Sequence, residues 1–311
     1  MKRNFKNILA CPLCRYPLTI AKGKIICKKG HTYRLNAGVP VMAKLSDYLE
    51  TEARAWDKEW KRGVGKSALL AYKNNMRIFK KLGFWEESGE AASLIPTGNN
   101  DTVLDLGCGN GVSTNYIRGK IIVGLDLSEP GMVKAKHRFP NKNYVVGEAL
   151  QLPFKSNVFN TVIAINLVHH IKNSSVVLEE IHRVLKKGGK LFTVDPNLTN
   201  PIGFLGRGLY KILGFKKIFP TFPQFALGEE ERQFTKQGYY KLFRKSPFKK
   251  FVIKPHRIER LLFFSTILIP PLIKIPFYEQ FLVSASTIGN RIVAHEPFDH
   301  LCYFWKGEAI K

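Results

Sequence analysis

Three glycines and two aspartates in close succession constrain the fold of this chain more than any other feature. Residues 103–106 form a mostly apolar run that predicts a short buried strand, and glycines follow at positions 107, 109 and 111. Glycine allows a tight turn and lets the backbone approach a ligand closely. A second apolar run, residues 121–125, ends at Asp126, whose carboxylate can accept two hydrogen bonds from a ribose. The pattern predicts a nucleoside site at the carboxyl ends of two neighbouring strands.

The position of Asp105 indicates which kind of nucleoside would bind. In a dinucleotide-binding domain a pyrophosphate lies over the helix that follows the glycine turn, and an acid immediately before that turn would repel it. Asp105 stands at that place, and its charge suits the ammonium group of an amino-acid-like cofactor. The sequence thus favours S-adenosylmethionine. The alternative is a glycine turn that serves only to pack a helix against a strand.

Four segments of the chain resemble the class I S-adenosylmethionine-dependent methyltransferases, in the broad subgroup that acts on small molecules, lipids and some RNAs. They follow the order and spacing of that family, at residues 104–111, 124–128, 147–154 and 184–191. The resemblance implies an α/β fold, with a Rossmann-like sheet of seven strands that has helices on both faces. It also implies that the chain is an enzyme with S-adenosylmethionine as its cofactor.

Through the same resemblance, particular residues of this chain are expected to hold the cofactor. These are Asp105, Gly107, Gly109, Asp126, Leu127, Glu148, Ala149 and Asn166. The first three would contact its methionine part, and Asp126 would bind the ribose. Leu127 and Ala149 would flank the adenine, and the Glu148 carboxylate can accept a hydrogen bond from the adenine amino group. Asn166 begins the segment that would face the transferable methyl group.

Two adjacent histidines follow the strand predicted over residues 161–165. Imidazole titrates near neutral pH, so His170, and after it His169, are the candidates for a general base if the acceptor must lose a proton. Alternatively, the pair only shapes the pocket. No Asn-Pro-Pro-aromatic motif follows this strand, which argues against a DNA methyltransferase acting on exocyclic amines.

Cys11, Cys14, Cys27 and His31 form a C-x2-C-x12-C-x3-H pattern, which is typical of zinc ligands. Four ligands leave no position for water, so we expect a structural or docking role for the metal. Zinc would stabilise residues 1–44, which contain too little apolar material for a core of their own. This predicted zinc ribbon resembles in part those of ribosomal RNA guanine-N1 methyltransferases and in part small zinc-binding methyltransferase activator proteins. The alternative is a coincidental group of four side chains.

Positive charge is concentrated outside the predicted methyltransferase core. The chain carries a net charge of +25; residues 1–44 hold ten Lys or Arg and no acid, and residues 201–260 hold fourteen against four acids. Residues 101–197 carry a smaller net positive charge, with twelve basic and eight acidic residues. Such clusters attract phosphates, either of RNA or of an anionic membrane surface. An ordinary solvated surface is the alternative.

The chain therefore divides into four predicted parts: a zinc ribbon (1–44), a helical linker and cofactor-covering segment (45–100), the cofactor-binding core (101–199), and cap insertions with final antiparallel strands (200–311). The apolar insertions at 200–225 and 261–283 favour a small-molecule or lipid-like acceptor. The run at 261–273 is too short to cross a bilayer, which needs about 20 residues. We expect a lid or an interfacial segment there.

Two other functions remain open at this point. The ribbon favours a 23S ribosomal RNA guanine-N1 methyltransferase that uses it for RNA docking. A non-catalytic zinc-binding interaction protein is disfavoured by the intact aspartates and glycines. The basic start of the chain lacks a sufficient apolar run before Cys11, so we expect a cytoplasmic protein, peripheral to the membrane if its acceptor is a lipid. The sequence does not indicate the oligomeric state.

Overall fold

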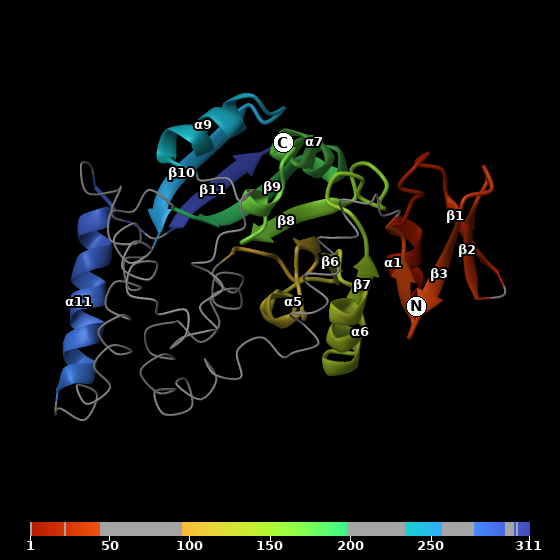
Figure 1. The fold of residues 1–311 in the computed structure, drawn as a ribbon, viewed down its shortest axis with the longest axis horizontal. Coiled ribbons are helices and arrows are strands. Elements are labelled where there is room, and N and C mark those ends of the chain that lie inside the picture. Colours follow the sequence, from red (N-terminus) through yellow and green to blue (C-terminus); the bar gives the residue numbers. More distant parts are fainter. Residues whose placement is uncertain are drawn as a thin grey trace, which may run out of the picture.

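The computed structural model describes residues 2–21, 23–43, 95–197, 234–256, 277–295, 302 and 304–311. Within these residues one sheet of eleven strands runs through the molecule in the order β1-β2-β3-β4-β7-β6-β5-β8-β9-β11-β10 (Figure 1). The predictions made for residues 45–94, 200–225 and 261–273 lie outside the described residues.

Seven of the eleven strands form the predicted methyltransferase sheet. Five are mutually parallel: β7 (Asn143–Val146), β6 (Ile121–Asp126), β5 (Thr102–Leu106), β8 (Phe159–Ile165) and β9 (Leu185–Pro196). The antiparallel strands β11 (Phe304–Ile310) and β10 (Lys250–His256) complete it beside β9. The parallel strands bring their carboxyl ends to one edge, which is where ligands of such sheets bind.

Helices cover both faces of this sheet, as expected. The described helices are α1 (Arg3–Ile8), α5 (Val112–Tyr116), α6 (Glu129–Arg138), the 3-10 helix η1 (Val168–His170), α7 (Ser174–Val184), α9 (Lys236–Arg244) and, at the margin of the molecule, α11 (Tyr278–Val293). Figure 1 shows α7 and α9 on one face and α5 and α6 on the other. Alternate residues of β5 follow this division: Leu104 joins the large core cluster, while Val103 belongs to a second, smaller cluster.

The N-terminal ribbon continues the same sheet, which the sequence did not predict. Its antiparallel strands are β1 (Leu18–Ala21), β2 (Lys24–Cys27), β3 (Thr32–Asn36) and β4 (Val39–Val41). Val41 of β4 pairs in parallel with Val146 of β7. Phe5, Leu9 and Met42 are buried in the large core cluster. The seven methyltransferase strands are present as expected, and the ribbon adds four more to the same sheet and buries its few apolar side chains against the core.

Polar contacts tie the ribbon to two helices of the core. Arg15 lies 3.0 Å from a carboxylate oxygen of Glu180 on α7 and donates to the carbonyl of Leu152 at 2.8 Å. On β3, Arg34 forms a two-bond ion pair with Glu129, the first residue of α6, and Asn36 Nδ2 donates to the same carboxylate at 2.6 Å. The ribbon therefore contacts the start of α6, next to the predicted ribose-binding strand end.

The last strand, β11, spans Phe304–Ile310. Gly307 sits in its middle because a Cβ there would come within 2.5 Å of the Thr193 hydroxyl oxygen. Because glycine is uncommon in strand interiors, Gly307 weakens the sequence pattern that would otherwise predict this strand.

Candidate functional site

Asp126, at the end of β6, joins the glycine turn to the following helix. One carboxylate oxygen accepts the backbone N–H of Gly109 at 2.9 Å, and the other accepts the N–H of Ser128 at 2.9 Å. Ser128 caps α6 by accepting from the Gly131 N–H at 3.1 Å. An ionised carboxylate has about four acceptor positions, so the Asp126 side chain has the chemistry that a ribose diol requires. The half-exposed Asp126 is therefore suited to a nucleoside.

The glycine turn is confined by its neighbours. Gly107, Gly109 and Gly111 adopt positive φ values of 76°, 53° and 78°. A Cβ on Gly107 would come within 2.8 Å of the Leu167 side chain, and one on Gly111 within 2.8 Å of the Tyr144 hydroxyl. Both conformation and space therefore demand glycine at positions 107 and 111. The turn is held in one shape between β8 and α6.

Asp105 lies beneath this turn and is only 2% exposed. One of its oxygens accepts hydrogen bonds from the hydroxyls of Ser113 and Thr114 on α5, both at 2.6 Å. Burial raises the pKa of Asp105 to about 6; the charge of Asp126 adds to this increase, and the two hydroxyls oppose it. Asp105 thus positions the first turn of α5, and its contact with an ammonium group stays a prediction.

Three further predicted cofactor residues lie on the ends of β6 and β7. Leu127 follows Asp126 directly, and Glu148 and Ala149 follow β7; all three are half-buried. The Gly147 N–H donates to the Asp126 carbonyl at 3.0 Å, which brings the two strand ends together. Burial raises the pKa of Glu148 above its ordinary value. The structure thus gathers the residues predicted to hold ribose and adenine at one edge.

Asn166 stands at the end of β8 in a left-handed conformation, with a φ of 53°. Its N–H donates to the carbonyl of Val194 on β9 at 2.7 Å. Non-glycine residues rarely adopt positive φ, although asparagine tolerates it better than most, and such positions cluster at functional sites. The bend turns the chain so that Leu167 lies over the glycine turn and the histidines follow.

His169 is held by a buried carboxylate that sequence reasoning did not pair with it. Its Nδ1 atom lies 2.9 Å from Asp195 Oδ1 at the end of β9, and its backbone N–H donates to the same oxygen at 3.2 Å. Because a carboxylate only accepts, Nδ1 carries the proton, and Nε2 is left to act on a substrate. Nothing in the sequence indicated this pair, because the two residues are 26 positions apart in the chain.

Tyr239 of α9 completes the arrangement from a distant part of the chain. Its hydroxyl donates to the other oxygen of Asp195 at 2.7 Å and lies 2.5 Å from the Thr193 hydroxyl. Burial, followed by the charge of Asp195, raises the pKa of Tyr239 well above its ordinary value. The second predicted histidine, His170, is half-buried, and its ring centroid lies 3.9 Å from that of His169. The structure brings both histidines to the edge that holds the cofactor residues.

The four predicted metal ligands converge on one point in the ribbon. The ligand atoms of Cys11, Cys14, Cys27 and His31 all lie within 4.8 Å of one another. His31 Nδ1 is 3.4 Å from Cys11 Sγ and 3.3 Å from Cys27 Sγ, and the Sγ atoms of Cys14 and Cys27 are 3.6 Å apart. In a tetrahedral site with Zn–S bonds of about 2.3 Å, ligand atoms are about 3.6 to 3.8 Å apart. The cluster therefore fits a zinc ion.

Tyr33 on β3 adds an outer contact to this cluster that the sequence did not reveal. Its hydroxyl lies 3.0 Å from Cys11 Sγ. Burial acts to raise the pKa of the Cys11 thiol, but hydrogen bonds from Tyr33 and from nearby backbone groups outweigh it, so the pKa is lowered. A lowered thiol pKa favours the thiolate, which is the form that binds metal.

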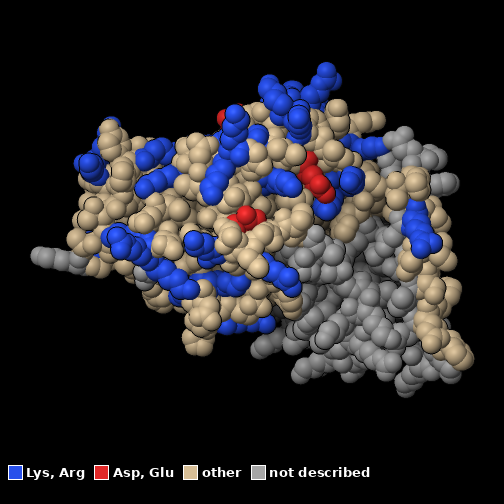
Figure 2. All heavy atoms as spheres, turned by 180° about the vertical axis from the view of Figure 1, so that it is seen from behind, with Lys and Arg blue, Asp and Glu red and all other residues tan. Residues whose placement is uncertain are grey.

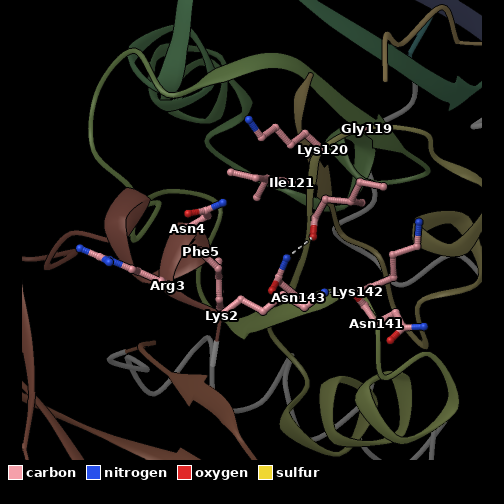
Figure 3. A pocket seen from close by; sticks show the side chains of 11 residues that line it. Lys2, Arg3, Asn4, Phe5, Gly119, Lys120, Ile121, Asn141, Lys142 and Asn143 are labelled. Carbon is pink, nitrogen blue, oxygen red and sulfur yellow. Dashed lines mark hydrogen bonds between the residues drawn. The ribbon is translucent and has the colours of Figure 1, made fainter. Parts of the chain in front are cut away.

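A separate open hollow of about 450 Å³ lies at the opposite edge of the sheet. Figure 3 shows its lining, which comes from α1 and from the turns before β6 and β7, at the amino ends of these strands. Lys2, Arg3, Lys120 and Lys142 line it, together with asparagines and no acid. Its position and charge separate it from the site at the carboxyl ends.

Comparisons with known proteins agree with this arrangement. A family model described as a methyltransferase domain matches residues 104–193. A putative 23S rRNA (guanine-N(1)-)-methyltransferase of Bacillus subtilis (strain 168) is 30% identical over 211 residues, which cover 63% of this chain and 67% of that protein. A demethylmenaquinone methyltransferase of Chlorobaculum tepidum is 29% identical, over 50% of this chain and 69% of that protein.

The solved structure of geranyl diphosphate C-methyltransferase from Streptomyces coelicolor A3(2) shares the fold, with a TM-score of 0.52, 16% identity, and coverage of 86% of this chain and 99% of that one. The geometry at the strand ends, the family match and the Bacillus relative agree with one another. The chain therefore belongs to the S-adenosylmethionine-dependent methyltransferases.

Proposed function

We propose that this enzyme methylates a small-molecule or lipid-like acceptor. The observation that carries the proposal is the buried pair of His169 and Asp195, which lies beside the cofactor edge and is only partly accessible. A sheltered imidazole suits a compact acceptor that enters the site whole. The Chlorobaculum relative is named for a quinone acceptor, and a relative from Mycobacterium ulcerans, 32% identical over 106 residues, is named for phthiotriol dimycocerosates.

In the proposed reaction, S-adenosylmethionine supplies an electrophilic methyl group on its sulfonium. Asp126 would hold the ribose, and Asp105 would place its charge near the ammonium group. The methyl group would pass from the cofactor sulfur, which keeps the electron pair of the broken bond, to a lone pair of the acceptor atom, and Nε2 of His169 would take the acceptor's proton. Asp195 accepts from Nδ1–H and stabilises the resulting imidazolium. Much of the rate would come from this positioning.

Between the two histidines, we infer that His169 is the base and that His170 shapes the pocket beside it. His169 has the Asp195 carboxylate on Nδ1, which fixes its tautomer with Nε2 unprotonated. His169 is 5% exposed, which keeps bulk water from competing for the proton. His170 is half-buried, and its stacked ring limits the movement of its neighbour.

We propose that zinc is a structural cofactor held by Cys11, Cys14, Cys27 and His31. The interatomic distances fit a closed tetrahedral shell, and the ribbon contains few apolar residues that could replace it. The metal would fix the turns that carry the ligands and, through β3 and β4, the edge of the methyltransferase sheet. We also propose a cytoplasmic site of action, peripheral to the membrane.

A 23S ribosomal RNA guanine-N1 methyltransferase is the second candidate. The ribbon's ten cations, the Bacillus relative and the hollow of Figure 3 favour it. In that hollow, burial and then the charge of Lys2 lower the pKa of Lys142, so an anion bound there would relieve the repulsion. The same cations would suit a phosphate of an RNA backbone.

A labelled-methyl transfer assay on fractionated cell extract distinguishes the two candidates. The purified protein is incubated with labelled S-adenosylmethionine, and the RNA, lipid and small-molecule pools are counted separately. We expect label in the lipid or small-molecule pool and none with the Asp126→Ala variant. Label confined to the RNA pool would replace the leading proposal with the second one. An unlabelled extract, with cofactor binding intact, would contradict both.

A further inference from the structure

Four large apolar side chains form an exposed stripe on helix α11. Phe277, immediately before the helix, is 78% exposed, and Phe281, Ile288 and Ile292 are 61%, 58% and 45% exposed. Their spacings of four, seven and four residues place them within about 60° of one another around a helix of 3.6 residues per turn. Scattered exposed apolar residues are ordinary, but a continuous stripe on one helix face indicates a binding surface.

The opposite side of the helix attaches it to the protein. Val293 is 2% exposed and belongs to the large core cluster, against which Phe251 and Ile253 of β10 also pack. Val293 lies about 160° around the helix from Phe277, so the stripe points away from the attached side. Figures 1 and 2 show α11 at the margin of the molecule. The stripe is thus presented outward.

Positive charge is concentrated in the segment to which α11 attaches. Residues 234–256, which form α9 and β10, contain seven cations and no acid: Lys236, Lys241, Arg244, Lys245, Lys249, Lys250 and Lys254. On α11 itself Arg291 is exposed beside the stripe. Figure 2 shows that blue Lys and Arg side chains far outnumber red acids on the face it presents. The helix that carries the apolar stripe is thus attached to a strongly cationic segment.

These two features together select one kind of partner. A second copy of the chain would cover the stripe but would bring its own charge of +25, which repels the first. An RNA would neutralise the cations but would leave the phenylalanines and isoleucines in water. An anionic bilayer surface satisfies both, because acyl chains receive the apolar side chains and acidic headgroups attract the lysines and arginines.

We propose that α11 lies in the interface of an anionic lipid bilayer, with Phe277, Phe281, Ile288 and Ile292 inserted and the α9–β10 cations on the headgroups. The helix has 16 residues, about 24 Å, and none of the described helices is long and apolar enough to cross a membrane. This inference rests on the proposed function, because a lipid-like acceptor would be reached from such a surface.

Vesicle flotation tests the proposal with the full chain. We expect binding to phosphatidylcholine vesicles that contain phosphatidylglycerol, and weak binding to phosphatidylcholine alone. The double substitution Phe281→Ser with Ile288→Ser should weaken partitioning about tenfold or more, because it removes apolar area from the inserted face. The matched control is Leu13→Ser with Tyr16→Ser, two side chains of the ribbon that are 40% and 43% exposed. It should bind as the wild type does.

A second variant tests the charge without touching the stripe. Lys254→Glu with Arg291→Glu, two exposed cations of β10 and α11, should abolish the preference for anionic vesicles, as should high salt. Unchanged binding by either variant would overturn the proposal. So would light scattering that shows a wild-type dimer which the stripe variant converts to monomer. Calorimetric titration with S-adenosylmethionine is a separate readout: failure to bind it would contradict the proposed function, whereas vesicle results bear on the membrane surface alone.

Discussion

His169 and Asp195 form a buried ion-pair geometry, with Nδ1 and Oδ1 2.9 Å apart and the aspartate fully buried. A buried carboxylate is costly unless it is paired and hydrogen-bonded. Asp195 meets this condition through the His169 ring, the His169 backbone N–H and the Tyr239 hydroxyl. The three residues come from η1, β9 and α9, so folding of the C-terminal region assembles the candidate base.

Replacing Asp195 by asparagine should lower kcat while leaving cofactor binding nearly unchanged. The amide no longer stabilises an imidazolium and can favour the wrong tautomer, so we expect a loss of about a hundredfold. Steady-state kinetics with the identified acceptor and calorimetry with S-adenosylmethionine measure the two effects. Tyr239→Phe, which keeps the carboxylate, should cost about tenfold or less. Equal losses in cofactor affinity and kcat would assign the pair a purely structural role.

The affinity for S-adenosylmethionine should rise with pH through the titration of Asp105. Its pKa is about 6 in the free protein, so it is mostly protonated at pH 5 and mostly ionised at pH 7. The cofactor's ammonium group favours the ionised form, and linkage then predicts about tenfold tighter binding at about pH 7 than at about pH 5. Calorimetry across this range measures it.

Asp105→Asn provides the control for that pH dependence. The amide is nearly isosteric, accepts from one of the two hydroxyls of Ser113 and Thr114, and does not titrate. Its affinity should be weaker than that of the wild type at pH 7 and nearly independent of pH. A wild-type profile that is equally flat would show that Asp105 does not sense the ammonium charge.

Asp126→Ala should abolish measurable cofactor binding, with a loss of about a hundredfold or more. The substitution removes the acceptor for a ribose diol and also the two bonds that hold Gly109 and Ser128 in place. Glu179→Gln, an exposed carboxylate on α7, is the matched control and should bind normally. Circular dichroism and calorimetry together separate loss of binding from loss of fold. If the Asp126→Ala variant kept its affinity for the cofactor, Asp126 would not be the ribose-binding residue.

Cys14→Ser should release zinc and lower the thermal stability of the whole chain. The ribbon shares the large core through Phe5 and Leu9, so losing its metal exposes apolar surface there, and we expect Tm to fall by about 5 °C or more. Metal analysis and thermal melting measure this. Cys302→Ser, a buried cysteine outside the cluster, should keep one zinc per chain. A zinc-free variant with an unchanged Tm would contradict the structural role.

Release of zinc should also weaken cofactor binding a few-fold. Arg34 and Asn36 on β3 hold Glu129, which directly follows the Ser128 cap bound by Asp126. Disorder in β3 would therefore loosen the residue that positions the ribose carboxylate. The variant Arg34→Ala tests this route with zinc in place, and its affinity for S-adenosylmethionine should fall by less than that of the zinc-free variant. If Arg34→Ala binds the cofactor as the wild type does, the ribbon and the site are not coupled through Glu129.

The sequence by itself determined the local features of this protein. A glycine turn requires its residues in consecutive order, and the ligands Cys11, Cys14, Cys27 and His31 lie on two short turns, so spacing alone indicated both sites. Strand periodicity likewise predicted β5, β6 and β8, because each strand alternates or runs apolar within a few residues.

Only the tertiary structure decided how distant segments combine. The pairing of β4 with β7, the placing of Tyr239 on Asp195 and the outward stripe of α11 depend on residues that are separated by long stretches of chain. Burial of Phe5 and Leu9 against the core stabilises the ribbon. The local sequence does not reveal this contribution, because apolar burial depends on which side chains come into contact after folding. Asp195 is therefore recognised as the partner of His169 only in the folded protein.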